Sequence, residues 1–475
     1  MSFSRLLFLS PFLLLASLAA TAAQPGTLRV DYMHSGNALQ DIYSLDKIVK
    51  EPLPWPGNLD QRIDGLNRGA YFFEVVEPTS GAILYSRGFS SIFGEWRTTP
   101  EARQQNRSFS ESLRFPMPGQ AVRIRLYARD DRNEFSMVWT LDVDPADTDV
   151  RSAHAPLASP VVAIRSNGDP QDKVDLLILG DGYTEAERTR FIADARRLSD
   201  ALFAVSPFKD RAGDFNVWAL MAAAPQSGVA RPSSGMHRWT PLGTRYDAFG
   251  SERYVLTFEN QALRELAQNA PYEFVEILVN NETYGGGGIY GLYSTAAAKS
   301  EWAPYLFVHE FGHHFAGLAD EYYTSPVSYE TGGTMRREPW EPNVTALHDP
   351  ARLKWRDRVA SDTALPTAWP KEAFETHQRE YQKVRADLRA RKRPESEMNA
   401  LFHREQRIED ELFMSSANKT RIGAFEGANY ESTGYYRSQL NCVMFTRTSS
   451  FCRICSDAIE AVIDQYASPK AHPAK

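Results

Sequence analysis

Apolar and polar residues alternate along several short runs in the first third of the chain. Leu28, Val30 and Tyr32 alternate with polar neighbours, and residues 122–129 and 135–143 repeat the pattern. A period of two is typical of antiparallel strands that bury one face. The runs predict an all-β domain over residues 24–150, most simply a small β-sandwich. We expect this domain to brace its neighbour or to help dock a substrate.

The pattern changes after a proline-containing stretch of low apolar content at residues 144–160, where we place the domain boundary. Residues 174–179 form a continuous apolar run interrupted only by Asp175, and apolar residues then recur at helical spacing over 191–202. Further buried strands are expected at residues 215–221 and 274–279. The fold class predicted is therefore α+β and multi-domain, with a β-sandwich followed by an α/β domain over residues 160–470.

Residues 371–413 differ sharply in composition from the rest of this second domain. About half of residues 371–392 are charged, with both signs present, and Pro394 divides two stretches of helical spacing. Mixed charges at helical spacing indicate solvated helices. We predict an inserted helical hairpin on the surface.

The first residues of the chain carry the pattern of a secretory signal. A basic residue, Arg5, precedes an apolar stretch at residues 6–18, and small residues follow to Ala23. This order is typical of a cleavable signal peptide, here residues 1–23. The stretch is too short for a good membrane span, and no cysteine precedes Cys442, which excludes lipid attachment at the new N-terminus. We therefore expect a secreted or periplasmic protein without stable membrane insertion.

Composition narrows the range of partners. The 475 residues carry a formal net charge of −7, which gives no reason to expect nucleic acid as a partner. A hydrophobic content of 43% with 12% aromatic residues is ample for sizeable cores. The partner expected is instead a protein or peptide substrate, for the reasons that follow.

The strongest chemical signal is His-Glu-x-x-His at residues 309–313. On a helix, His309 and His313 lie one turn apart on the same face, so both imidazoles can reach one Zn²⁺ ion. Glu310 is placed to act on a water molecule rather than on the metal, where a general base is needed. The pattern predicts a zinc hydrolase with one catalytic zinc ion. The helix is expected to begin near Pro304 and to end at Gly317.

A catalytic zinc keeps three protein ligands and one open position. The metzincin pattern supplies its third ligand after a glycine turn, but here Gly317 and Asp320 each stand one residue later than that pattern requires. Asp320 is the first choice for the third ligand and Glu321 the alternative, with Glu321 otherwise orienting a histidine. His314 is expected to face away from the metal.

Three further features belong to the same hypothesis. The glycine run at residues 285–288 permits close backbone approach, and residues 289–294 are either an edge strand beside the cleft or part of a flexible loop. Met444 is predicted to form a hydrophobic floor beneath the zinc histidines, the Met-turn, unless it is an ordinary core residue. Tyr435 or Tyr436 is a candidate for stabilising an oxyanion.

Cys442, Cys452 and Cys455 are the only cysteines of the chain. Secreted proteins favour disulfides, so we expect Cys442 to pair with Cys452 or Cys455 and one thiol to remain. A structural zinc site is not expected from these residues, because it needs four ligands and only three cysteines exist.

Several segments resemble the IgA-specific metalloendopeptidase-like family of secreted zinc peptidases, which is related to the metzincins. The segments are residues 179–184, 284–290, 309–322 and 442–444, with 26–32 and 85–91 resembling the family's N-terminal domain. The resemblance implies a metzincin-like zinc endopeptidase with ligands His309, His313 and Asp320 and with Glu310 in catalysis. It does not imply that immunoglobulin is the substrate.

The function predicted is therefore peptide-bond hydrolysis by a metal-activated water, with Glu310 as general base. Two alternatives remain open at this point. One is a zinc amidase that acts on cell-wall peptides or glycoconjugates, and the other is a non-catalytic binding protein that kept the fold. Intact His309, Glu310 and His313 argue against the second alternative.

Overall fold

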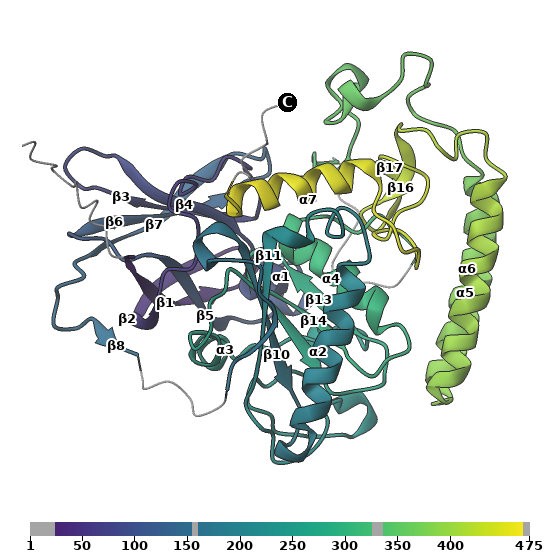
Figure 1. The fold of residues 1–475 in the computed structure, drawn as a ribbon. Helices are drawn as coiled ribbons and strands as arrows, with labels where there is room; N and C mark the ends of the chain where they lie inside the picture. Colours follow the sequence, from purple (N-terminus) through teal and green to yellow (C-terminus); the bar gives the residue numbers. More distant parts are fainter. Residues whose placement is uncertain (1–23, 154–159, 325–335, 469–475) are drawn as a thin grey trace, which may run out of the picture.

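The computed structural model describes residues 24–153, 160–324 and 336–468. It has a two-domain architecture with mixed α/β content and several sheets, as the sequence predicts (Figure 1). The predicted signal peptide, residues 1–23, lies outside the described residues. Among the described residues, no helix combines the length and the apolar character needed to cross a membrane.

The N-terminal domain consists of two four-stranded sheets around one hydrophobic core. The first sheet has the order β5-β1-β2-β8, with β1 (Gly26–Gly36), β2 (Asp41–Pro54), β5 (Arg107–Pro116) and β8 (Arg151–Ser152). The second has the order β4-β3-β6-β7, with β3 (Tyr71–Val76), β4 (Ile83–Phe89), β6 (Val122–Arg129) and β7 (Phe135–Val143). A short helix, α1 (Ile92–Trp96), follows β4.

Strand β1 departs from the half-buried pattern that alternation predicts. Its polar side chains Arg29 and Asp31 are buried, and Arg29 pairs with Asp31 at 2.9 Å and with Glu51 at 3.0 Å. The same guanidinium donates to Gln268 of the second domain. The second face of β1 is therefore covered by the other domain, which period-two alternation does not reveal.

The second domain is built on a six-stranded mixed sheet of order β13-β14-β12-β10-β11-β9. The strands are β9 (Val162–Arg165), β10 (Val174–Asp181), β11 (Phe215–Met221), β12 (Phe274–Val279), β13 (Gly286–Ile289) and β14 (Tyr293–Ala297). Strands β10, β11, β12 and β14 run parallel, whereas β9 and β13 at the two ends are antiparallel to their neighbours. The expected edge strand at residues 289–294 is wrong in its position, because the glycine run itself forms the edge strand β13.

Helices cover both faces of this sheet (Figure 1). On one face Leu176 and Ile178 of β10 join the core with α2 (Arg188–Leu202), α4 (Ala303–Ala316) and α7 (Arg453–Tyr466). On the other face Leu177 and Leu179 join α3 (Asn260–Ala267) and α1 of the first domain. Burial on both faces explains the continuous apolar run of β10.

Two long helices, α5 (Lys371–Ala390) and α6 (Glu395–Met414), lie side by side at the edge of the molecule (Figure 1). Pro394 precedes α6 directly, at the position where the sequence pattern breaks. Phe402 of α6 packs directly against Tyr284 and Trp302, and a small sheet of order β15-β17-β16 completes the domain. Its strands are β15 (Val344–Thr345), β16 (Phe425–Ala428) and β17 (Glu431–Arg437).

The first domain also holds the end of helix α4. The buried guanidinium of Arg68 donates to the carbonyl of Ala316, the last residue of α4, at 2.9 Å and to that of Ala458 in α7 at 3.0 Å. A cation at a helix C-terminus complements its partial negative charge. The N-terminal domain therefore braces the helix that carries the histidine motif.

Candidate metal centre and active site

Helix α4 places His309, Glu310 and His313 on one side of a deep cleft. The helix begins next to Pro304, which suits a first turn, and Gly317 ends it in the left-handed conformation with φ 61°. Most of its remaining side chains are buried against the sheet and α2, which fixes the direction in which the motif points.

The two histidines turn one nitrogen each toward a common point. Their Nε2 atoms lie 3.2 Å apart. Nδ1 of His309 donates to the carbonyl of Val443 at 2.9 Å, and Nδ1 of His313 donates to the carbonyl of Leu318 at 2.5 Å. Since a carbonyl only accepts, these bonds put the proton on Nδ1 and leave a lone pair on each Nε2.

Asp320 completes a triangle with these nitrogens. Its Oδ1 atom lies 3.1 Å from Nε2 of His309 and 3.2 Å from Nε2 of His313. Oδ1 is buried and has no hydrogen-bond partner, whereas Oδ2 accepts a 2.5 Å hydrogen bond from the hydroxyl of Tyr430. The structure therefore brings together the first-choice ligands of the sequence analysis and leaves an unsatisfied oxygen facing them.

This donor set fits a zinc ion. Donors about 2.0–2.1 Å from zinc in tetrahedral geometry lie roughly 3.3 Å from one another, close to the separations in the triangle. Two neutral imidazoles and one carboxylate leave a fourth position open, as in catalytic sites. Without a metal, burial lowers the pKa of His313, but the neighbouring Asp320 carboxylate outweighs it and raises that pKa to about 9, so a metal ion that binds here displaces a proton. The centre thus attracts positive charge.

Glu310 lies beside the triangle without joining it. A carboxylate oxygen of Glu310 is within 4.8 Å of a ligand nitrogen of each histidine, and the side chain lines the cleft. Burial raises the pKa of Glu310, while His309 and His313 act in the opposite direction. A carboxylate with a raised pKa beside an open metal position is suited to proton transfer near neutral pH.

Glu321 takes neither of the two roles predicted for it, which were third ligand of the catalytic zinc and orienting a histidine. Its carboxylate points away from the histidines and accepts a 3.0 Å hydrogen bond from Asn343. Asn343 also bonds both the amide and the carbonyl of Ala319, at 2.8 Å and 2.9 Å, and so fixes the bend after α4. Successive residues of this extended bend face opposite sides, so Asp320 reaches the histidines and Glu321 cannot. The histidine N–H groups use the carbonyls of Val443 and Leu318 instead.

His314 faces away from the centre, as its place on the helix predicts. Its Nε2 accepts from the amide of Val275 at 3.1 Å, and its Nδ1 donates to the carbonyl of Ile289 at 3.1 Å. Burial lowers the pKa of His314 to about 3. This neutral histidine ties α4 to two strands of the sheet.

Met444 lies directly beneath the helix. A Cβ atom added to Gly312 would stand 3.1 Å from Sδ of Met444, so the sulfur fills the space that this glycine leaves. The carbonyl of Met444 accepts from the amide of Glu321 at 2.9 Å. The position corresponds to the hydrophobic floor predicted for it, and it also holds the bend that carries Asp320.

The tyrosine candidates divide between the two faces of β17. Tyr435 lines the cleft beside Arg336. Tyr436 does not line it and interacts with Glu426. Adjacent residues of a strand point to opposite faces, so only one of the pair faces the cleft. The prediction that Tyr436 could stabilise an oxyanion in the cleft is therefore wrong.

Sequence reasoning missed three side chains close to the triangle: Arg253, Tyr322 and Tyr430. Arg253 donates to the hydroxyl of Tyr322 at 2.8 Å, and both line the cleft. The ring of Tyr322 stacks on His309 with centroids 6.3 Å apart. Tyr430 occupies the two-residue turn between β16 and β17, where Asn429 and Tyr430 both have positive φ. Paired positive φ values in such a turn are a hairpin signal, but nothing in the sequence points this turn at Asp320.

The glycine run brings β13 against α4. A Cβ atom on Gly286 would stand 3.0 Å from Cγ of Glu310, and one on Gly288 would overlap the carbonyl oxygen of Glu310. On its outer side Gly286 pairs with the backbone of Arg253 and Val255. The glycines thus allow a strand edge to run directly along the catalytic helix.

The cleft has a volume of about 1440 Å³. Pockets for small ligands hold roughly 300–1000 Å³, so this cleft has room for a longer chain. Its walls come from both domains and include Ser90 and Asn133 of the first and Trp340 and Tyr435 of the second. Both domains therefore line the cleft.

The three cysteines are free thiols in the structure, so the expected disulfide is not formed. All three are buried, and Sγ of Cys442 lies 3.7 Å from Sγ of Cys455. They gather near Glu321 rather than at the surface.

Comparison with known families adds one finding to this geometry. Residues 162–463, more than half of the chain, match the family described as IgA peptidase M64, and residues 20–140 match the peptidase M64 N-terminus. A search of curated proteins finds no match.

Proposed function

The chain belongs to the IgA peptidase M64 family, and on this premise we propose that it is a zinc-dependent endopeptidase. Family membership makes it a peptidase with a protein or peptide substrate. We propose in addition that the metal is zinc, that the residues named below have the roles described, and that the enzyme cleaves within a polypeptide chain. The proposal also includes a cleavable signal peptide at residues 1–23 that directs the protein out of the cytoplasm.

The observation that carries the proposal is the triangle of Nε2 of His309, Nε2 of His313 and Oδ1 of Asp320, with sides of 3.1–3.2 Å. The buried Oδ1 atom has no partner besides the two imidazoles, and one metal ion bound to all three atoms would satisfy it. In this proposal these three residues hold the zinc ion. The domain around them is metzincin-like, with Asp320 one residue beyond the usual ligand position.

Zinc, when bound, supplies a Lewis acid that polarises a peptide carbonyl and makes water acidic enough to attack it near neutral pH. Glu310 takes the proton from the attacking water and delivers it to the leaving nitrogen. Its raised pKa suits both steps. The carbonyls of Val443 and Leu318 hold the imidazoles in the required tautomer.

Arg253 and Tyr322 are the groups best placed to stabilise negative charge on the substrate oxygen. Arg253 donates to the Tyr322 hydroxyl, so the hydroxyl proton of Tyr322 is left to donate into the cleft. A donor aimed at developing charge in a water-poor site is worth more than one in solvent. Tyr435 stands on another wall, beside Arg336, and is assigned to substrate contact.

The substrate binds in extended form in the cleft beside α4, which the glycines of β13 also line. The outer edge of β13 is already paired at Gly286, with the backbone of Arg253 and Val255, so the peptide does not add a strand to the sheet at that residue. A chain that follows the cleft passes in front of Glu310, which lines it.

Incubation of the purified full chain with an unfolded protein and, separately, with cell-wall muropeptides tests the proposal. We expect internal cleavage of the protein, its loss with a chelator, and its return when zinc is restored. Matched reactions with His313→Ala show whether the activity belongs to this centre. Cleavage that survives in His313→Ala, or hydrolysis of muropeptides alone, contradicts the proposal.

A further inference from the structure

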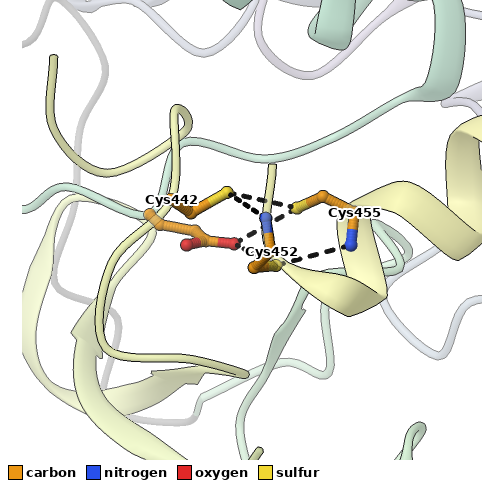
Figure 2. Close-up of side chains that lie close together, drawn as sticks. Cys442, Cys452 and Cys455 are labelled. Carbon is orange, nitrogen blue, oxygen red and sulfur yellow. Dashed lines mark hydrogen bonds between the residues drawn. The ribbon is translucent and has the colours of Figure 1, made fainter. Parts of the chain in front are cut away.

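A second group of metal-ligating side chains lies behind the bend that carries Asp320. It consists of Glu321, Cys442, Cys452 and Cys455, whose ligand atoms all lie within 4.8 Å of one another. Figure 2 shows the three cysteine side chains pointing toward one another from a loop and from the start of α7. We propose that these four residues form a structural zinc site, separate from the catalytic one.

The distances suit a tetrahedral ion. Sulfurs bound to zinc at about 2.3 Å lie roughly 3.8 Å apart in tetrahedral geometry, and Sγ of Cys442 is 3.7 Å from Sγ of Cys455. Oε1 of Glu321 lies 3.4 Å from Sγ of Cys455 and 3.9 Å from Sγ of Cys452. One ion in the middle can therefore contact all four side chains with little movement.

Burial of the carboxylate points to a cation at this place. Glu321 and Cys455 are fully buried, and Oε2 of Glu321 has no hydrogen-bond partner. A buried carboxylate oxygen without a partner is costly, and the three thiols are weak donors that satisfy it poorly. A disulfide between any two of the thiols leaves this carboxylate with Asn343 as its only strong donor, whereas a metal ion compensates its charge.

Backbone amides and one guanidinium lie close to two of the sulfurs. Cys452 is the N-cap of α7, and its Sγ accepts from the amide of Cys455 at 3.4 Å. The amide of Cys452 in turn donates to Sγ of Cys442 at 3.2 Å. The buried guanidinium of Arg437 adds a positive charge near Glu321 and Cys442. Helix N-termini and amide donors stabilise thiolate ligands.

The site is closed and therefore structural. All four positions of a tetrahedral ion are taken by protein, and none of the four side chains reaches the cleft. The ion would join the bend after α4, the loop at Cys442 and the start of α7. Glu321 adjoins Asp320, and Cys442 adjoins Val443, whose carbonyl accepts from His309. The second ion thus positions the ligands of the first.

Metal analysis and cobalt substitution of the full wild-type chain test this site. We expect about two zinc ions per chain and an intact mass that shows three unoxidised cysteines. In the cobalt-substituted protein we expect sulfur-to-metal charge-transfer absorption. The centre at His309, His313 and Asp320 contains no sulfur, so this absorption reports the second site alone.

Variants separate the two sites. His313→Ala should lose one zinc ion and keep the charge-transfer absorption, and Cys455→Ala should lose that absorption. Glu321→Gln should release the second zinc at a lower chelator concentration. Glu409→Gln is its matched control, because Glu409 is also buried and accepts from an amide, that of Gln378 at 2.9 Å, yet lies outside the site. This control should keep both ions.

Three results overturn the second site: one zinc ion in the wild type that is lost in His313→Ala, an intact mass lower by two hydrogen atoms, or cobalt protein without the charge-transfer absorption. If Cys455→Ala does not fold, the measurements on the wild type and on His313→Ala still show whether the second zinc site exists. An absence of peptidase activity leaves these readouts unchanged, so failure of the proposed function and failure of this site are distinguishable.

Discussion

The hydroxyl of Tyr430 donates a 2.5 Å hydrogen bond to Oδ2 of Asp320, while Oδ1 of the same carboxylate faces both histidines. One oxygen is thus held by the protein and the other is left for a metal. Outer hydrogen bonds of this kind orient a ligand and are worth roughly 10–100-fold in metal affinity. The hairpin turn between β16 and β17 is therefore part of the metal centre, although it lies far from the histidine motif in the chain.

Tyr430→Phe removes this hydrogen bond and leaves the ring in place. We expect zinc affinity at the catalytic centre to fall roughly 10–100-fold, as measured by competition with a chelator. Tyr436→Phe is the matched control, since Tyr436 lies outside the cleft and next to Glu426. Equal affinity in the Tyr430→Phe and wild-type proteins rules out the orienting role.

Glu310→Gln keeps the shape of the side chain and removes its ability to take a proton. The variant should retain both zinc content and thermal stability, because Asp320 rather than Glu310 lies 3.1–3.2 Å from both Nε2 atoms. Peptide hydrolysis should fall by at least about 10²-fold, the usual contribution of a general base. Turnover at the wild-type rate in a zinc-loaded variant is incompatible with the mechanism.

Gly288→Ala tests the contact between β13 and α4. The new Cβ would stand 2.9 Å from Cβ of His313 and would overlap the carbonyl oxygen of Glu310. We expect a loss of about 1–3 kcal/mol in the free energy of unfolding, together with reduced hydrolysis. In Gly213→Ala the Cβ meets no atom within 4 Å, so this control should leave activity unchanged. Full activity and stability in Gly288→Ala disprove the close approach.

Much of the site follows from local patterns in the sequence. The spacing of His309 and His313 fixes their common face, because both lie on one helix, and the glycine after that helix sends Asp320 back toward them. These inferences need only a few residues of chain. The bend also determines that Asp320 rather than Glu321 faces the histidines. This could not be predicted from local sequence, because the bend is held by hydrogen bonds between Ala319 and Asn343, which lies 24 residues further along the chain.

The remaining parts depend on tertiary packing. Arg253 and Tyr430 reach the centre from other elements, and no spacing rule connects them to the motif. The fourth member of the cysteine group was overlooked for a different reason. A count of cysteines gives three donors, whereas Glu321 is placed among them only by the fold. The buried face of β1 was likewise hidden, because it is covered by the second domain.

Asp175 predicts a pH dependence of stability that is independent of the metal centre. This carboxylate is buried in β10 and accepts from Trp218 at 2.7 Å and Asn216 at 3.1 Å, and burial raises its pKa to about 6. A folded-state pKa above the ordinary value of 3.8 means that folding favours the protonated form. Its contribution to stability is therefore complete below pH 3.8 and is lost as the pH rises to about 6.

Asp175→Asn keeps the acceptor for Trp218 and cannot ionise. Relative to this variant, the wild type should lose on the order of 3 kcal/mol in the free energy of unfolding between about pH 4 and pH 6, and nothing further above it. Urea unfolding of both proteins across this range measures the difference. The neighbouring Glu273 accepts from the amide of Asp175, and burial together with the charge of Asp175 raises the pKa of Glu273, so both proteins carry Glu273→Gln to remove its titration. A constant difference between them shows that Asp175 does not titrate in this range.

The most direct measurement of the central claim is anomalous X-ray scattering at the zinc absorption edge from crystals of the purified wild-type chain. The account predicts an anomalous peak in contact with Nε2 of His309, Nε2 of His313 and Oδ1 of Asp320, with Glu310 next to it and not bound. A zinc-loaded crystal with no peak at this triangle, or with the peak held by Glu310 in place of Asp320, contradicts it.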